Sequence, residues 1–475
     1  MKKGKILALV FMLIVSVVLI AACAGDGGSG SDSAQEALSR GGRYPLIEDM
    51  DGYVFTIADN EHSRYFNPQA GRNDLADAQV DLIRKLEQSF NIKLEIVETD
   101  PIISFDIILP KYLAGEKYAD LIVANYYNAG KFYSQNMLED LGSIPGMNLS
   151  APYWDKNIIA SVNPEPGVTH FAIPEWGYSY ALASVVFYNK TLINELGLED
   201  PYELYKNGRW TMDKYVEMAR AATRKLSGTG EMTWDDQWGV VAEDIFNGYP
   251  NSLYFASGLK MIDIDNTGRK IYGFNTPQAK EVLTDIQEMI INGGFHAKKE
   301  GYISGQDSGN KFKSGSALFI TTGVETLPHF ASMDDDFGVV PMPKGKFTDK
   351  YIAPINFNAA VFCVQRNNPD LDKVGTILDA MAEWGEPVLE AQIDEFDNRF
   401  LRDASSREVM ANIRNDYLSV DLGMLSAADR DGITQVTIVL ISHIMTDINT
   451  KAASTIDANA ERAQQLIDDF WNKSR

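Results

Sequence analysis

The sequence predicts an α/β protein with a largely parallel sheet, and three observations support this. Short apolar strands alternate with helices, as in layered α/β proteins whose ligands bind at the carboxyl ends of the strands. The 475 residues are enough for two or more core-forming units, and 45% hydrophobic with 23% charged residues is an ordinary globular composition. With only Cys23 and Cys363, no disulfide framework is expected, so packing must stabilise the fold.

The first elements show this alternation. Tyr53 to Ala58 is a short apolar and β-branched run, typical of a buried strand. From about Asp74 to Phe90, apolar residues recur at steps of three and four, which places them on one face of a helix. Ile92 to Val97 alternates apolar with charged residues, and Asp120 to Ala124 is another short apolar strand. This order of strand, helix and strand favours parallel pairing.

Later helices carry recognisable end signals. Thr276 is a good N-cap, Pro277 suits the first helical position, and Gly293 can close the helix between them. Further helices are expected from about Asp370 to Trp384 and around Ala458 to Trp471. No internal repeat of about 20 to 50 residues is visible, which disfavours a solenoid or a propeller.

The amino terminus has the layout of an export signal. A basic start is followed by an apolar run from Ile6 to Ala22, which Ser16 alone interrupts. This run has 17 residues, so an uncleaved membrane helix is the alternative. Leu19 to Cys23 resembles a bacterial lipobox, in which the cysteine thiol carries a diacylglyceryl group. We therefore predict a lipoprotein signal peptide at 1–22 and lipidation of Cys23, with a plain signal that happens to end at a cysteine as the alternative.

Residues 23–47 are predicted to be a flexible Gly/Ser linker, because such a composition buries too little apolar surface to offset its ordering entropy. Removal of the signal takes away three lysines and no acids, so the net charge changes from −23 to −26. Such a surface repels polyanions, which makes nucleic acid an improbable partner. The sequence thus predicts an acidic body on the outer face of the cytoplasmic membrane, held there by its lipid.

Catalytic and metal-binding motifs are mostly missing. The five histidines are scattered, and the sequence contains no His-Glu-x-x-His, Cys-x-x-Cys, Gly-x-Ser-x-Gly or Gly-x-x-x-x-Gly-Lys motif. We therefore expect no metal, no cofactor and no enzymatic activity. The alternative is a surface-tethered glycoside hydrolase, because such an enzyme needs only two suitably spaced carboxylates and the chain has 66 acids.

Several segments, taken in order, resemble one family. They are 188–192 (YNKTL), 195–201 (ELGLEDP), 208–213 (GRWTMD), 315–320 and 337–343. With the lipobox, the pattern covers nearly the whole chain and is similar to the extracellular solute-binding proteins of family 1, the ligand receptors of ATP-driven carbohydrate importers. Trp210 matches a residue with which this family seats the following helix, whereas Trp384 and Trp471, at helical spacing, are expected to pack in the core.

The resemblance implies a two-lobed, periplasmic-binding-protein-like fold of type II with a hinge between the lobes. Ligand would bind in the cleft and be handed to an ABC permease, and the protein would be a monomer. A sensor that reports to a signalling partner is a variant. Crossings are expected near 179–187, 351–360 and 421–427. The implied lobes are 48–178 plus 360–420 for lobe 1, and 179–359 plus 421–475 for lobe 2.

Sugars present apolar C–H faces and hydroxyl rims, so a site for them needs aromatic rings together with carboxylates or amides. Trp176 and Tyr178, beside Glu175, are the leading candidates, with packing at the hinge as the alternative. Other candidates follow strand ends. On lobe 1 they are Asn125, Tyr126 and Tyr127, and Asp59, Asn60 and Glu61. On lobe 2 they are Glu243, Asp244, Phe246 and Asn247, and Thr322, Gly323 and Glu325, for which a solvated loop is the alternative. Family members that bind malto-oligosaccharides often carry an aromatic residue in the loop at 322–325, and its absence here argues against a maltose-like ligand.

Overall fold

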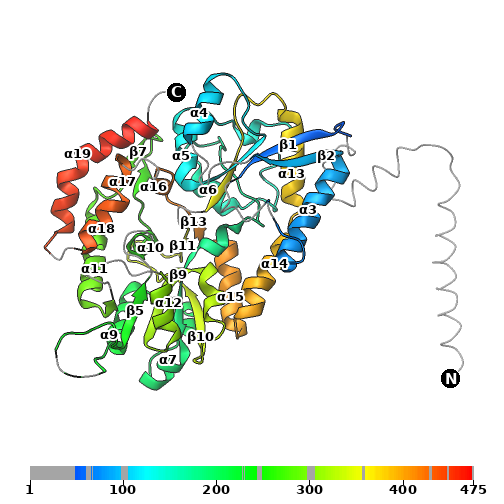
Figure 1. The fold of residues 1–475 in the computed structure, drawn as a ribbon. Coiled ribbons are helices and arrows are strands. Elements are labelled where there is room, and N and C mark those ends of the chain that lie inside the picture. Colours follow the sequence, from blue (N-terminus) through cyan, green and yellow to red (C-terminus); the bar gives the residue numbers. More distant parts are fainter. Residues whose placement is uncertain are drawn as a thin grey trace, which may run out of the picture. The chain divides into compact units, whose positions relative to one another are not determined.

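The computed structural model describes most of the chain from residue 49 onward, and residues 50–475 form one compact unit (Figure 1). The predicted signal peptide, Cys23 and the linker up to residue 47 lie outside the described residues. No helix within the described part is long and apolar enough to cross a membrane. The described residues are 49–59, 66, 68–97, 105–226, 228, 230–242, 249–296, 305–355, 359–426, 431–446 and 449–472.

The first sheet has the strand order β12-β3-β1-β2. β1 pairs in parallel with both β2 and β3, and β12 runs antiparallel to β3. The predicted order of strand, helix and strand is confirmed, and β3 extends one residue further than expected, to Asn125. The strands are β1 Tyr53–Ala58, β2 Ile92–Val97, β3 Leu121–Asn125 and β12 Ala360–Cys363.

Helix α3 (Asp74–Phe90) forms where the three- and four-residue spacing predicts it. The Asn73 side chain caps it by accepting a hydrogen bond from the Ala76 amide, and Leu82, Leu86 and Phe90 are buried. α13 (Leu371–Glu383) and α14 (Glu386–Ile393) pack beside it (Figure 1). These helices cover the first sheet, and α13 confirms the helix predicted from about Asp370.

The second sheet has the order β10-β4-β9-β5-β8. β5 is parallel to β8 and β9, whereas β4 is antiparallel to β9 and β10. Together the two sheets and their helices give the two-lobed α/β fold that the resemblance implies. The strands are β4 Ser184–Asn189, β5 Trp238–Ala242, β8 Phe295–His296, β9 Ala317–Gly323 and β10 Phe337–Pro341.

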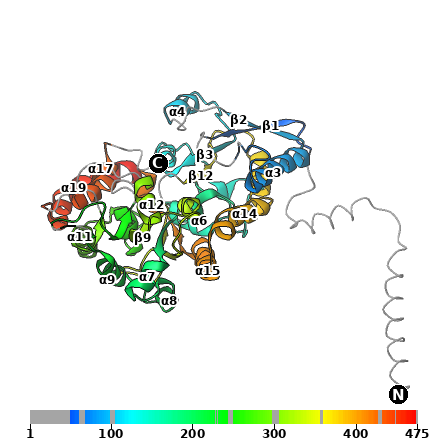
Figure 2. The same ribbon diagram turned by 60° about the horizontal axis from the view of Figure 1, so that its bottom comes forward.

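Helices surround the second sheet (Figure 2). Trp210 is buried and its indole N–H donates to the Pro341 carbonyl at 2.8 Å, just before Thr211 caps α9. Thr276 caps α11 as predicted, whereas α19 begins at Ala452 and not at about 458, because Ala452 and Ile456 continue its buried face. The helices are α7 Lys190–Leu196, α8 Pro201–Lys206, α9 Met212–Ala222, α10 Tyr249–Ala256, α11 Pro277–Asn292, α12 Gly305–Lys313 and α19 Ala452–Trp471.

Three segments run side by side where the chain passes between the sheets. Ala183, just before β4, pairs with Ile355, and β11 (Ala353–Pro354) pairs in parallel with β13 (Leu418–Ser419). The Ile355 amide also donates to the Ser419 carbonyl at 2.9 Å. Backbone hydrogen bonds therefore join the three connections to one another. The third connection pairs at 418–419, just before the expected crossing at 421–427.

One segment assigned to lobe 1 packs on the second sheet. α15 (Ala404–Asn412) lies on β10, and Asp403 just before it accepts a hydrogen bond from Lys190 at 2.9 Å. Tyr202 on α8 donates to Glu408 at 2.8 Å. Residues around 403–412, which the sequence-based prediction assigns to lobe 1 within 360–420, therefore contact the second sheet and its helices.

The remaining elements connect or cover these layers. β6 and β7 form an antiparallel hairpin beside α19. Their bounds and those of the other helices are β6 Ile262–Ile264, β7 Lys270–Tyr272, α4 Phe105–Leu113, α5 Tyr126–Ser134, α6 Lys156–Val162, α16 Leu422–Leu425, α17 Ile433–Val436 and α18 Ile438–Thr446, with short 3-10 helices η1 Leu141–Ser143, η2 Tyr178–Leu182 and η3 Val324–Phe330, and π-helical turns η4 Asp394–Asn398 and η5 Ile413–Tyr417.

Candidate functional site

On the first sheet, polar residues meet at the carboxyl ends of two parallel strands. The pairing of Ala58 with Ile122 places the end of β1 beside β3. Asp59 follows β1 and is buried, and Asn125 closes β3 opposite Ala360 of β12. This edge is where parallel α/β sheets bind ligands.

On the second sheet, the corresponding edge lies beside the start of β4. Ala242 pairs with Thr321, which brings the carboxyl ends of β5 and β9 together, and Ser184 pairs with Gly323. Thr322 is buried there and its hydroxyl lies 2.9 Å from that of Thr326. The second sheet thus presents hydroxyl groups where the first crossing enters it.

The crossings link these two edges. The Tyr126 amide donates to the Ala359 carbonyl at 2.8 Å, next to the start of β12, and Val324 donates to Ala183 at 3.2 Å. Asn125, Tyr126 and Thr322 therefore lie within a few residues of a connecting segment. The region around the crossings is the candidate functional site.

Trp176 lies in the packed interior. It is 1% exposed, its indole N–H donates to the Met381 carbonyl at 3.0 Å, and its ring meets Phe362 edge to face. A Cβ on Gly385 would lie 2.0 Å from the indole, so α14 approaches the ring closely. Tyr178 is also buried, with its ring edge to face with Phe396. These environments favour the hinge-packing alternative for both rings.

Glu175 is half-buried beside a second carboxylate. Burial raises the pKa of Glu175 to about 7, and the negative charge of Asp155 adds to the rise, whereas Arg414 and Lys156 oppose it. Asp155 caps α6 by accepting from the Ile158 amide at 2.9 Å, and burial raises the pKa of Asp155 to about 6. Glu175 and Asp155 therefore lie close together in a poorly solvated region just before the first crossing.

A buried ion pair supports this region from two π-helical turns. Arg414 in η5 donates to Asp397 in η4 at 3.0 Å, and the Tyr180 hydroxyl of η2 donates to the same carboxylate at 2.9 Å. Burial raises the pKa of Asp397, and the positive charge of Arg414 opposes that rise. π-helical turns often mark functional sites. Here they hold the segment that leads into β4.

Asn125 and Tyr126 have clear structural roles. The Asn125 side chain caps α5 by accepting from the Asn128 amide at 3.2 Å, and Tyr126 is fully buried. The side chains of Tyr127, Asn60, Glu61, Glu243, Asp244, Phe246 and Asn247 lie outside the described residues. The part that these candidates play in binding, and that of Asp59, Thr322 and Glu325, stays a prediction.

Some polar groups at this place were missed from the sequence. Asn128, Ser179 and Asn251 are buried, yet each has a side-chain atom that bonds to no described residue. The signal that could have found Asn251 is its position, since it and Ser252 interrupt the otherwise apolar helix α10. The Ser252 hydroxyl lies 2.8 Å from that of Ser184, so α10 touches the first residue of β4.

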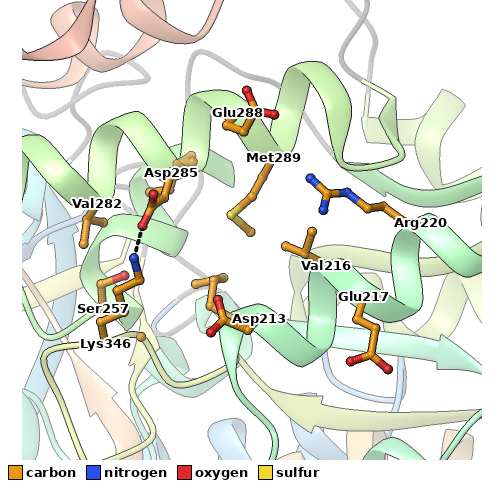
Figure 3. Close-up of a pocket in the computed structure, with 13 residues that line it drawn as sticks. Asp213, Val216, Glu217, Arg220, Ser257, Val282, Asp285, Glu288, Met289 and Lys346 are labelled. Carbon is orange, nitrogen blue, oxygen red and sulfur yellow. Dashed lines mark hydrogen bonds and ion pairs between the residues drawn. The ribbon is translucent and has the colours of Figure 1, made fainter.

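A separate hollow of about 500 Å³ lies between α9 and α11 (Figure 3). Val216 and Met289 contribute to its apolar floor, and Lys346 at its rim donates to Asp285 at 2.6 Å and Glu281 at 3.0 Å. Its lining comes from α9, α11 and two loops beside the second sheet, away from the crossings. No group of three or more His, Cys, Asp or Glu in the described part of the chain could hold a metal ion.

Solved structures share this fold at low sequence identity. A cyclo/maltodextrin-binding protein complexed with maltotetraose is 14% identical, with a TM-score of 0.60 over 89% of this chain and 98% of that one. UspC of M. tuberculosis is 15% identical, with a TM-score of 0.61 over 87% of this chain and all of that one. An ABC substrate-binding protein of Listeria monocytogenes, in complex with cycloalternan, is 14% identical, with a TM-score of 0.57 over 89% and 100% of the two chains.

Curated proteins give no significant sequence match to the chain. A family model does: the model of the bacterial extracellular solute-binding proteins matches residues 106–381. This match covers more than half of the chain and includes β3, the first crossing and every strand of the second sheet. The chain therefore belongs to the bacterial extracellular solute-binding proteins, a family of binding proteins and not of enzymes.

Proposed function

We propose that this protein captures a carbohydrate or a similar neutral polar solute between its two lobes and delivers it to an ABC permease. The observation that carries the proposal is the meeting of polar sheet edges from both lobes at three mutually paired crossings, in a chain of this family. The lobes would close on the solute, because the solute contacts both of them only in the closed form and thereby shifts the hinge equilibrium.

The solute class is proposed from the related structures together with the chemistry of the site. Those structures are described with maltotetraose, cycloalternan, acarbose, ribitol and α-D-tagatose, which are all polyhydroxylated. Hydroxyls, amides and carboxylates lie around the crossings and can hydrogen-bond to solute hydroxyls, and the positive charge of Arg414 is paired with Asp397. The carboxylates repel anions. A neutral polyhydroxylated solute therefore fits better than an anionic one.

We also propose that Cys23 carries a lipid and that residues 23–47 tether the body to the outer face of the membrane. For the lobes, we propose the boundaries predicted from the sequence, except that α15 and the residues just before it belong with lobe 2. In this arrangement the acyl group holds the receptor near its permease, and the linker leaves the lobes free to close.

A melting-shift screen tests the solute class. The chain truncated before Tyr44 would be heated alone and with maltotetraose, maltose, cycloalternan, acarbose, ribitol and α-D-tagatose. A ligand at 100 times its Kd stabilises the folded state by about 2.7 kcal/mol, which is a measurable rise in Tm. The absence of a shift with every carbohydrate and polyol would contradict the solute class.

The lipid anchor has its own test. The full chain and its Cys23→Ala variant would be produced in bacteria fed an alkynyl fatty acid, and label would be read on the purified protein. We expect label on the unmodified sequence alone. Equal labelling of both, or of neither, would contradict lipidation at Cys23.

A further inference from the structure

The side chain of Asn251 is buried without a hydrogen bond. It is 1% exposed, and neither its Oδ1 nor its Nδ2 bonds to any described residue. Buried amides almost always have partners, because a buried donor or acceptor that lacks one is destabilising. Asn163 shows the usual case: its Nδ2 donates to two backbone carbonyls, and its Oδ1 accepts from two backbone amides.

The position of Asn251 connects it to the crossings. Its neighbour Ser252 contacts the Ser184 hydroxyl at 2.8 Å, and Ser184 pairs with Gly323 at the edge that carries Thr322. α10 also packs against β11, the strand of the second crossing (Figure 1). Asn251 therefore lies on lobe 2, one residue from a contact with the hinge.

Two further unbonded groups lie near the same connections. The Ser179 hydroxyl, in η2 just before the first crossing, is 1% exposed and bonds to no described residue. The Asn128 Nδ2, in the first turn of α5 at the edge of the first sheet, is likewise buried without a partner among the described residues. Both lobes thus carry uncharged polar groups that the folded chain leaves unsatisfied.

A packing role does not account for Asn251. Its buried neighbour Ser252 has a partner in Ser184, and the following residues Leu253 and Tyr254 are apolar or aromatic, so an aliphatic side chain would suit the position of Asn251 better than an unbonded amide. The amide also caps no helix, since both of its polar atoms are unbonded. A partner outside the protein is what would satisfy it.

We propose that the Asn251 amide reads a solute group that both donates and accepts hydrogen bonds, such as two neighbouring hydroxyls of a sugar or polyol. This inference rests on the proposed function and deepens it. An amide offers a donor and an acceptor side by side, so a simple anion or cation would satisfy only half of it. Asn251 would then select for hydroxyl-rich neutral solutes.

The test compares binding with stability. Asn251→Leu replaces the amide by an apolar group of similar size, and Asn163→Leu is the matched control on a fully bonded amide. Affinity would be measured by calorimetry with whichever of maltotetraose, cycloalternan or ribitol shifts the Tm of the unmodified chain most. We expect Asn251→Leu to weaken binding about tenfold or more and to leave the Tm of the ligand-free protein unchanged or higher. Asn163→Leu should lower that Tm clearly.

Every result decides a part of the proposal. Unchanged affinity in Asn251→Leu and in the smaller variant Asn251→Ala would overturn the role of Asn251, as would a loss of ligand-free stability as large as in Asn163→Leu. If none of the three compounds binds the unmodified chain, the solute class of the proposed function fails, and the hydroxyl-reading role fails with it. The stability comparison then still decides separately whether the amide is unbonded in solution.

Discussion

Glu175→Gln is expected to stabilise the protein at pH 8 and to leave its stability at pH 5 nearly unchanged. Burial, with the charge of Asp155, raises the pKa of Glu175 from its ordinary 4.5 to about 7. Between these values the folded protein binds a proton that the unfolded chain has lost. The free energy of unfolding therefore falls as the pH rises from about 4 to about 7, and the stability that the bound proton supplies is absent above the folded pKa. Glutamine cannot ionise, so the stability of the variant does not fall in this pH range for this reason.

The size of the effect follows from the shift. A change from 4.5 to about 7 corresponds to about 3.4 kcal/mol at 1.36 kcal/mol for each pKa unit. Glu175 is only partly buried, so solvent screens its charge, and about half of that figure, roughly 1–2 kcal/mol, is expected at pH 8. The repulsion by Asp155 is already part of this shift of the Glu175 pKa, so it adds nothing further to the expected gain.

Urea unfolding of both proteins at pH 5, 6, 7 and 8 measures this directly. The difference in unfolding free energy should grow from near zero to its full value across the series. Glu390→Gln, on the exposed side of α14, serves as the control for an exposed glutamate and should change stability by less than about 0.5 kcal/mol. A difference between Glu175→Gln and the unmodified chain that is constant with pH, or a loss at pH 8, would refute the reasoning.

Three further substitutions test the packing around the crossings, each by urea unfolding. Trp176→Ala should lower the unfolding free energy by about 3–5 kcal/mol, because the indole is fully enclosed, and a loss below about 1 kcal/mol would return it to the candidate ligand contacts. Asp397→Ala leaves the Arg414 charge buried without its partner and should lower the unfolding free energy by about 3–5 kcal/mol. The double variant with Arg414→Met should regain much of that stability. Gly130→Ala should lower the unfolding free energy by about 1–3 kcal/mol although alanine is the better helix former, because its Cβ would lie 1.9 Å from a backbone oxygen of α16. Gly309→Ala is the control: its Cβ would lie 3.1 Å from a movable side chain, so the change should be neutral or stabilising. A similar result for both variants would contradict the close approach of α16 to Gly130.

The regular elements were predictable because their signals are local. The period of α3, the caps of α11 and the strand runs of the first sheet each depend on residues a few positions apart, and the structure has them where expected. The association of α15 with β10 was not predictable in this way. It depends on contacts such as that of Lys190 with Asp403, 213 positions apart in the sequence. Order along the chain alone does not show that α15 packs on the second sheet.

The candidate site was predictable in position more than in residues. Strand ends and crossings predicted where polar groups would lie, because sheet topology fixes the edge at which the carboxyl ends of the strands lie. The choice of Trp176 rested on residue type, and type does not tell whether an indole faces a cleft or a core. Its burial depends on α13 and α14, whose packing against it the sequence does not show. Asn251 was missed for the converse reason, since the sequence shows only that it interrupts an apolar helix, and its missing hydrogen bonds are seen in the structure alone.

Some of the destabilising groups lie near the crossings. Glu175 must ionise in a poorly solvated place, and Ser179 and Asn251 are buried with unsatisfied polar atoms. Each of these would be easy to replace by a residue that folds better, so their presence needs a reason other than stability. In the proposed function, a bound solute would supply one, because its hydroxyls would satisfy these groups when the lobes close. If that is the reason, Glu175→Gln should stabilise the empty protein at pH 8, Asn251→Leu should leave its stability unchanged or higher, and both should reduce the rise in Tm that a sugar produces.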